Sequence, residues 1–402
     1  MNEQRIVILG AGFAGMMTAL RLSRRLPKDG PAITLASASD LFVERTRLHQ
    51  VATAQNPKTY RIGDMLRGTR VQFVRGGATS IQADQKLLTI ETESGSQAIR
   101  YDTLVYALGS RPDTQRFPGI AQAFVLDASG ARRLAETLPT IAAKRGQVLV
   151  IGGGLTGIEA ATEIAESFPS ARVALATRHT LGDGLSAPGA AHVRTVFERL
   201  GIQVHNSQTI VRIENGAAIT ASGQRLGFET CVNCAGFVAS SLARDAGLAA
   251  TPVGQLEIDA YMRSTSQPDI YGAGDAAAFE PAAHMSLRMA CATAMPMAIQ
   301  TADNLVARYT GQMPQPFAFG YVIRCISLGR RDALVQFVDA RDKPEARILT
   351  GRLASATKEF ILRYVTVSLA AERHFSLYQA PRATVAQATA HTESPVISLT
   401  RP

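Results

Sequence analysis

The sequence predicts an α/β protein built from two parallel-sheet domains, the second inserted into the first, followed by a smaller α+β region. Three glycine-rich stretches along the 402 residues support this prediction. Two of them, Arg5 to Gly15 and Val148 to Glu159, each join an apolar strand to a helical run. The third, Ile270 to Ala276, is an apolar strand that ends on Gly-Asp. A lone glycine turn is weak evidence, but two in this context, with the third motif behind them, form a specific pattern.

The first strand–turn–helix unit covers residues 5–26, and the apolar residues 6–9 are typical of a buried parallel strand. Glycines at this spacing permit a tight turn, let the backbone approach a pyrophosphate and let the helix pack on its strand. The positive end of the helix then faces the phosphates. The predicted dinucleotide contacts are Gly10, Gly12, Ala14 and Gly15.

The acidic residue that normally follows about 20 residues later and binds the ribose hydroxyls is absent. Ser37 stands at that place, at the end of the next predicted strand. We expect its hydroxyl to donate to a ribose oxygen. The alternative is a glycine-rich turn that binds no ligand.

The second unit repeats the arrangement, with predicted cofactor contacts at Gly152, Gly154, Leu155, Thr156 and Gly157. This unit also lacks the acidic residue at the end of its second strand. Thr177 occupies that position, and Arg178 follows it. A carboxylate at this point bonds the 2′-hydroxyl of NAD and repels a 2′-phosphate. Its replacement favours NADPH, although NADH is not excluded. The alternative for Arg178 is a solvated surface side chain.

Strands that close on a glycine help to divide the chain. The segment 103–109 ends on Gly109, and the segment 230–236 ends on Gly236 in the same way, which makes the two units a weak internal repeat. We count both glycines among the cofactor contacts. The predicted first domain comprises residues 1–114 and 255–315, around an inserted domain of residues 115–254. Residues 316–402 form a C-terminal interface region, with strands over 321–328 and 333–339, a helix over 353–372 and a poorly ordered tail from 380.

The third motif suggests a flavin. Asp275 follows Gly274 at the end of an apolar strand, where a carboxylate can accept from a ribityl hydroxyl. The alternative is an aspartate that caps the next helix. In flavoproteins of this layout the segment 42–50 runs beside the flavin ring, which makes Arg45, Arg47, His49 and Gln50 candidates for flavin or substrate contact. A helix with an exposed charged face is the alternative for that segment. We expect structural or surface roles for His192, His205 and His284.

The composition limits the remaining possibilities. The formal charge of +9 fits anionic substrates, acidic partners, a membrane surface or simply a solvated basic face. No basic block is interleaved with aromatics, so nucleic acid is not indicated. There is no leader-like start and no apolar run of about 18 residues, and we expect a cytoplasmic protein.

The pair Cys231 and Cys234 forms C-x-x-C late in a predicted strand. Side chains at i and i+3 of a strand point to opposite faces, so we reject a redox pair. A second ligand pair is lacking, and no metal site is predicted.

This order of motifs resembles the two-dinucleotide-binding-domain flavoproteins of the pyridine nucleotide-disulfide reductase superfamily, and within it the type II NADH dehydrogenase-like proteins. The resemblance implies FAD in the first domain and NADPH or NADH in the inserted one. It also implies that Glu159 lies near the nicotinamide and the flavin, as a catalytic residue together with Arg47 and His49. The cysteine pair of glutathione reductase-like members is absent from residues 42–47. Pro296 stands about where type II enzymes carry the glutamine of their quinone site, which weakens the case for a quinone.

We therefore predict an FAD-dependent NAD(P)H oxidoreductase that passes electrons to a quinone-type or aromatic small-molecule acceptor. The alternatives are a reductase of a ferredoxin-like carrier protein and a flavin-based redox sensor with little turnover. We expect a homodimer. Residues 358–373 fit an amphipathic helix that touches a membrane, but a dimer or core helix is favoured.

Overall fold

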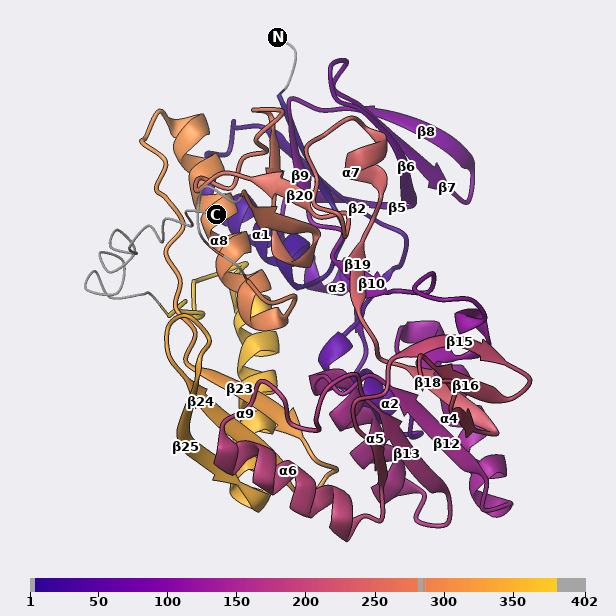
Figure 1. The fold of residues 1–402 in the computed structure, drawn as a ribbon. Coiled ribbons are helices and arrows are strands. Elements are labelled where there is room, and N and C mark those ends of the chain that lie inside the picture. Colours follow the sequence, from indigo (N-terminus) through magenta and orange to yellow (C-terminus); the bar gives the residue numbers. More distant parts are fainter. Residues whose placement is uncertain (1–3, 281–284, 286, 382–402) are drawn as a thin grey trace, which may run out of the picture.

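A computed structural model of the chain describes residues 4–280, 285 and 287–381 (Figure 1). His284 and the tail beyond residue 381 lie outside these residues. The first domain occupies the upper part of Figure 1, the inserted domain lies below it, and the C-terminal strands stand beside the inserted domain. In the described residues, the helices all fall short of the length and apolarity that crossing a bilayer requires.

The first domain is built on a parallel sheet of order β21-β9-β1-β2-β5. Its strands are β1 (Arg5–Leu9), β2 (Ala32–Ser37), β5 (Val71–Arg75), β9 (Thr103–Tyr106) and β21 (Ile270–Gly272). The side chains of residues 6–9 are buried, as expected for a central parallel strand. Helices α1 (Phe13–Arg25) and α8 (Cys291–Thr310) pack against each other, which ties residues before and after the insertion into one core.

The inserted domain has a second parallel sheet of order β11-β18-β12-β13-β14. Its strands are β11 (Phe124–Val125), β12 (Gln147–Ile151), β13 (Arg172–Ala176), β14 (Gln203–His205) and β18 (Thr230–Asn233). Helices α4 (Ala128–Ala143), α5 (Leu155–Ser167) and α6 (Ala187–Arg199) belong to this domain, together with an antiparallel sheet of β15 (Ile210–Glu214), β16 (Ala217–Thr220) and β17 (Arg225–Gly227). Both predicted parallel-sheet domains are therefore present.

Two antiparallel strands carry the chain between the domains. They are β10 (Ser110–Pro112) and β19 (Phe237–Ala239). Immediately afterwards α7 (Leu242–Asp245) buries Leu242 and Ala243 in the core of the first domain, against β6 (Gly77–Gln82). These apolar side chains thus already pack in the first core, ahead of residue 255, where the sequence places the return to the first domain.

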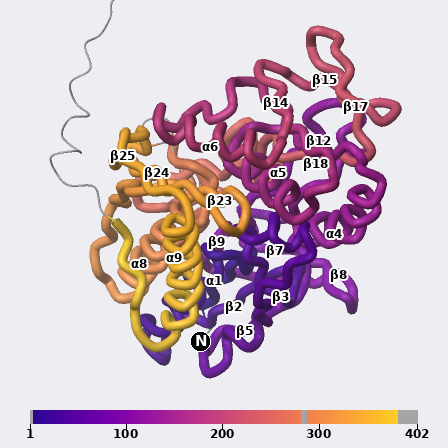
Figure 2. The backbone as a smooth tube through the Cα atoms, turned by 90° about the horizontal axis from the view of Figure 1, so that it is seen from below, coloured from indigo at the N-terminus to yellow at the C-terminus, as the bar shows by residue number. Residues whose placement is uncertain are grey.

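The C-terminal region contains an antiparallel sheet and a long helix. The sheet comprises β23 (Ile323–Ser327), β24 (Ala333–Val338) and β25 (Pro344–Thr350), and α9 (Gly351–Ala371) packs on β24. Strand β23 meets α5, β25 meets α6, and α9 also contacts α1. Figure 2 shows this region along one side of both domains. The region therefore bridges the two dinucleotide-type domains within one chain.

Asp332 is one of the side chains that fix this bridge. It is buried and accepts hydrogen bonds from His192 and Arg199 of α6, both at 3.0 Å.

The remaining elements are short: β3 (Leu41–Phe42), β4 (Tyr60–Arg61), β7 (Leu87–Thr92), β8 (Gly95–Arg100), β20 (Leu256–Ile258), β22 (Ala277–Phe279), α2 (Leu48–Val51), α3 (Ile62–Met65) and the 3₁₀ turns η1 (Arg45–Arg47), η2 (Ile120–Gln122) and η3 (Gly274–Ala276).

Candidate cofactor and electron-transfer site

The first glycine turn lies at the carboxyl end of β1 and has the backbone that a pyrophosphate needs. Gly10 has φ +95°, and a Cβ there would overlap the carbonyl of Ala107. A Cβ at Gly15 would overlap the carbonyl of Gly10, so the helix can approach the turn only with glycine. Gly12 caps α1 without any side-chain hydrogen bond, and the space at its Cβ position is open to 4 Å. The helix amides thus face a space that an anionic group fits.

The second turn repeats these features at the end of β12. Gly152 has φ +115°, and a Cβ at Gly157 would overlap the Gly152 carbonyl. Gly154 caps α5 without a side-chain bond and is open like Gly12. Leu155 and Thr156 begin α5 and are partly exposed. The residues present therefore fit a second dinucleotide as well as the first.

The two replacements for the missing acids lie at the predicted strand ends. Ser37 is the last residue of β2 and is partly exposed. Thr177 follows β13 and is buried, with its hydroxyl packed beneath Gly153 of the second turn. Arg178 is exposed. At the end of β13, the Thr177 side chain is therefore buried, whereas the charged side chain of Arg178 is exposed to solvent.

The third motif lies against the first turn. A Cβ at Gly274, which has φ +70°, would come within 2.8 Å of the Ala14 Cβ. Asp275 accepts a hydrogen bond of 2.7 Å from the Ser110 hydroxyl, and Arg45 donates to the Ser110 carbonyl. Burial raises the pKa of Asp275, against the effect of the Ser110 bond and of Arg45. Sequence reasoning missed Ser110; its place directly after Gly109 was the available signal.

Arg45 is held over the crossing between the domains. Its guanidinium lies 5.6 Å from the centre of the Phe237 ring, next to Gly236, which has φ +90°. Gly109, with φ +70°, precedes Ser110. Pro296 is buried inside α8, two residues after Ala294, which borders Gly274. Gly109 and Gly274 thus lie at the carboxyl ends of β9 and β21, and the other predicted residues of this paragraph lie next to them.

Glu159 on α5 is fixed by the C-terminal region. Its Oε1 atom accepts from the ammonium of Lys358 on α9 and from the Ser327 amide at 3.0 Å. Burial raises the pKa of Glu159, but Lys358, His49 and the Ser327 amide together outweigh it, and the net pKa lies below the usual range. Sequence reasoning took Lys358 only as the flank of an amphipathic helix, because nothing local reveals its partner.

Arg47 and His49 lie beside this pair. Arg47 donates to Glu359 of α9 at 2.7 and 3.0 Å and to Glu44 at 2.7 Å, so two carboxylates neutralise it. His49 is 4% exposed, and its Nδ1 atom lies 3.8 Å from Glu159 Oε2. Burial lowers the pKa of His49 to about 4, which leaves the ring neutral at pH 7.

A comparison with known protein families decides the assignment. Residues 4–303 match the model of the pyridine nucleotide-disulphide oxidoreductases. The chain belongs to this family. Family members use FAD with NADH or NADPH, and the protein is an FAD-dependent oxidoreductase, as the three motifs predicted.

Relatives within the family share most of the chain. An NADH dehydrogenase-like protein of Mycobacterium tuberculosis is 29% identical over 360 residues, covering 82% of this chain and 87% of its own. The demethylphylloquinone reductase of Synechocystis is 25% identical, covering 87% and 90%. Among solved structures, the sulfide:quinone oxidoreductase of Aquifex aeolicus superposes with a TM-score of 0.79 at 20% identity, covering 92% of each chain. That likeness concerns the fold.

The cysteines do not supply the disulphide that the family name suggests. Cys231 is buried, and all four cysteines are free thiols. Burial raises the pKa of Cys231, and it raises that of Cys234 to about 12, which keeps both thiols protonated at neutral pH.

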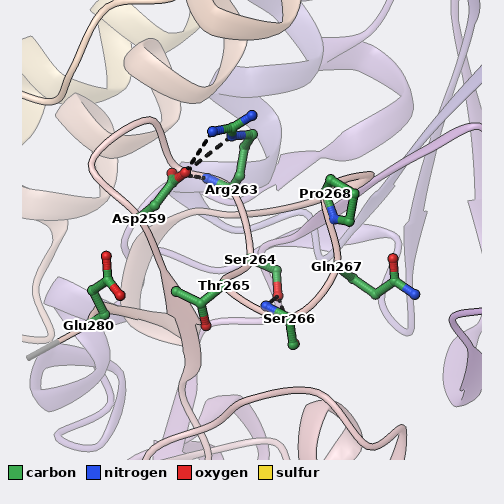
Figure 3. A pocket seen from close by; sticks show the side chains of 8 residues that line it. All are labelled: Asp259, Arg263, Ser264, Thr265, Ser266, Gln267, Pro268 and Glu280. Carbon is green, nitrogen blue, oxygen red and sulfur yellow. Dashed lines mark hydrogen bonds and ion pairs between the residues drawn. The ribbon is translucent and has the colours of Figure 1, made fainter.

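A polar pocket lies elsewhere on the first domain (Figure 3). It is lined by Asp259, Arg263, Ser264, Thr265, Ser266, Gln267, Pro268 and Glu280. Most of these residues precede β21, whereas Gly274 and Asp275 follow it, so pocket and third motif lie at opposite ends of that strand. Arg263 is paired with Asp259 at 3.0 Å. Cofactors of parallel sheets bind at the carboxyl ends, which separates this pocket from the cofactor site.

Proposed function

We propose that this flavoprotein passes electrons from NADPH or NADH to a quinone-type or aromatic small-molecule acceptor. The observation that carries the proposal is the contact between the third motif, at Gly274, and the first glycine turn, at Ala14. The second glycine turn joins β12 to α5 in the inserted domain. The acceptor class is supported by the names of relatives, which include a demethylphylloquinone reductase and type II NADH:quinone oxidoreductases. The alternatives of a carrier-protein reductase and a redox sensor gain no support from these names.

The residues of the first domain have binding roles in this proposal. Gly10, Gly12 and Gly15 give the pyrophosphate of FAD its backbone cradle, and Ser37 donates to the ribose. Asp275, held by Ser110, accepts from the ribityl chain. When bound, FAD supplies the two-electron transfer between the nicotinamide and the acceptor. The chain contributes by holding both rings in register and excluding water.

Glu159 and Lys358 have a different role, because they are charged and nearly buried. In this proposal one negative and one positive charge lie beside the nicotinamide and flavin rings. The ammonium of Lys358 keeps the Glu159 carboxylate ionised. Such a carboxylate can accept a hydrogen bond from a ring or a substrate group, or hold a proton for the acceptor. Arg47 supports the pair by tying η1 to Glu359, the neighbour of Lys358 on α9.

The coenzyme preference rests on Arg178. An exposed guanidinium that follows the strand end can meet a 2′-phosphate, and no acidic residue stands at this position to repel it. We therefore infer that NADPH is accepted at least as well as NADH. The cytoplasmic location and the homodimer stay predictions from the sequence.

A panel of acceptors tests the proposal. The flavoprotein is reduced anaerobically and then mixed with quinones, a ferredoxin or oxygen. We expect re-oxidation by quinones to be the fastest and to depend little on ionic strength. Fast, strongly salt-dependent re-oxidation by the ferredoxin alone would overturn the acceptor assignment in favour of a carrier-protein reductase.

A further inference from the structure

Two buried polar atoms without hydrogen-bond partners face each other near Glu159. Among the described residues, His49 Nε2 and Glu163 Oε2 are buried and lack any hydrogen bond, and they lie 3.8 Å apart. Glu163 is fully buried on α5, one helical turn after Glu159. A buried carboxyl or imidazole without a hydrogen-bond partner is destabilising, so such a pair requires an explanation.

Of the other polar atoms of the two side chains, Glu163 Oε1 has a hydrogen bond and His49 Nδ1 faces a second carboxylate. Glu163 Oε1 accepts a hydrogen bond of 2.5 Å from the Gln55 amide. His49 Nδ1 faces Glu159 Oε2 at 3.8 Å, whereas Lys358 and Ser327 occupy Oε1. The four side chains therefore form a row in the order Gln55, Glu163, His49 and Glu159. Hydrogen bonds at active sites are often long in the absence of a ligand and tighten when it binds, so the two distances of 3.8 Å are compatible with hydrogen bonds in the loaded protein.

With a neutral His49 ring and an ionised Glu159, only one distribution of protons satisfies the whole row. An ionised Glu163 can only accept, so His49 would have to carry its proton on Nε2. A neutral ring would then turn the bare Nδ1 lone pair towards the carboxylate of Glu159, which is repulsive. A neutral Glu163 instead donates from Oε2 to Nε2, and Nδ1–H donates to Glu159. The Gln55 contact is consistent with this distribution. Glu163 Oε1 accepts from Gln55 as the carbonyl oxygen of the acid, so the proton is on Oε2.

We propose that Glu163 is a buried, protonated carboxylic acid that fixes the His49 tautomer and thereby orients Glu159. Glu163 and His49 are positioning residues in this arrangement, because they act on the reaction only through Glu159. The proposal rests on the proposed function in one respect, namely that Glu159 lies beside the reacting rings.

The surrounding charges are compatible with a neutral Glu163. Burial raises the pKa of Glu163. The ionisable groups that face it are Glu159, Glu166 and Arg330, and those that face His49 are Glu159, Lys358, Arg330 and Arg47. The Gln55 hydrogen bond and Arg330 favour the ionised form of Glu163, and Arg330 also interacts with Glu359 at 3.8 Å. Burial, which is the largest effect, acts together with Glu166 and Glu159 against them, and the net pKa of Glu163 is raised.

The matched variants E163Q and E163L test the proposal in the FAD-loaded protein. A glutamine can donate from its amide nitrogen to His49 and accept from Gln55, as the acid does, but leucine can do neither. We expect ¹⁵N NMR at pH 7 to place the proton of His49 on Nδ1, facing Glu159, in all three proteins. The unprotonated Nε2 atom should show the chemical shift of a hydrogen-bond acceptor in the wild type and in E163Q, but not in E163L, whose ring is no longer held by a donor at residue 163 and donates less well to Glu159. The signal of His49, one of seven histidines, is identified by its absence from H49Q.

The pH profile of flavin reduction gives the second readout. Loss of one donor to a carboxylate raises its pKa by about one unit, so the acidic limb moves up by about one pH unit in E163L. In E163Q the limb stays in place. A proton on Nε2 in the wild type, or an E163Q that behaves like E163L, would overturn the proposal. If NAD(P)H reduces no variant while the Nδ1 tautomer is present, the proposed function fails instead. If E163L does not fold, the wild-type tautomer still decides.

Discussion

Lys358 of α9 and Glu159 of α5 form an ion pair, although 199 residues separate them in the sequence. Their side chains are 9% and 15% exposed. The pair links the C-terminal helix to the helix that begins at the second glycine turn. It makes the C-terminal region part of the candidate site as well as a bridge between domains.

The variant K358M tests the strength of this link. Removing one partner of a nearly buried pair leaves an uncompensated carboxylate, so we expect a loss of about 3 kcal/mol in the free energy of unfolding at pH 7. Urea denaturation measures it. The double variant K358M/E159Q should recover most of the loss, since it leaves no buried charge. Equal stability of K358M and the wild type would contradict a buried ion pair.

The buried His49 gives folding a defined pH dependence. Its pKa is about 4 in the folded chain and near 6.5 when unfolded, so the unfolded state binds the proton first as the pH falls. The stabilisation by the neutral ring is complete above pH 6.5 and is lost between there and about pH 4. The wild type should therefore lose about 3 kcal/mol over this range that H49Q does not lose. Parallel stability curves for the two proteins would show that His49 is not buried in its neutral form.

Gly12 and Gly154 offer a matched pair of substitutions for the two nucleotide sites. Both have extended backbones, and a Cβ at either meets no protein atom within 4 Å. We expect G12A to fold normally but to bind FAD at least about tenfold more weakly, because the methyl group occupies the pyrophosphate space. G154A should keep its FAD and show an increase of about tenfold in KM for the nicotinamide coenzyme. Absorbance of the bound flavin and steady-state kinetics distinguish the two. Retention of FAD by G12A with weaker nicotinamide binding would reverse the assignment of the domains.

Arg178 tests the coenzyme preference. We expect R178A to raise KM for NADPH by roughly tenfold, the typical loss for one charge-assisted hydrogen bond, and to leave KM for NADH unchanged. Arg172, exposed at the start of β13, provides the control R172A. An equal effect of R178A on both coenzymes would rule out recognition of the 2′-phosphate by this residue.

The glycine turns were predictable because their information is local. A tight turn, a close backbone approach and a packed helix each require glycine at a fixed spacing, and Gly10 to Gly15 and Gly152 to Gly157 meet these demands within a few residues. The long helix α9 was also visible, because its apolar residues recur at helical spacing. Strand β25 was not, since it begins with Pro344 and carries Glu345 and Arg347 on a largely exposed surface.

The partners of the predicted residues could not be found in the same way. Ser110, Glu163 and Lys358 have ordinary local contexts, and their roles arise only when separate elements meet. The packing of Leu242 on the first core is likewise a tertiary effect that no local pattern reveals. Sequence patterns thus located the nucleotide turns, whereas the charged groups around Glu159 required the fold.

The reduction of bound flavin under anaerobic conditions tests the central claim most directly. The purified protein should be yellow, and an equivalent of NADPH or NADH should bleach the absorbance of the oxidised flavin without any acceptor. A colourless protein that cannot be reconstituted with FAD, or one that stays yellow with either coenzyme in excess, would contradict the account.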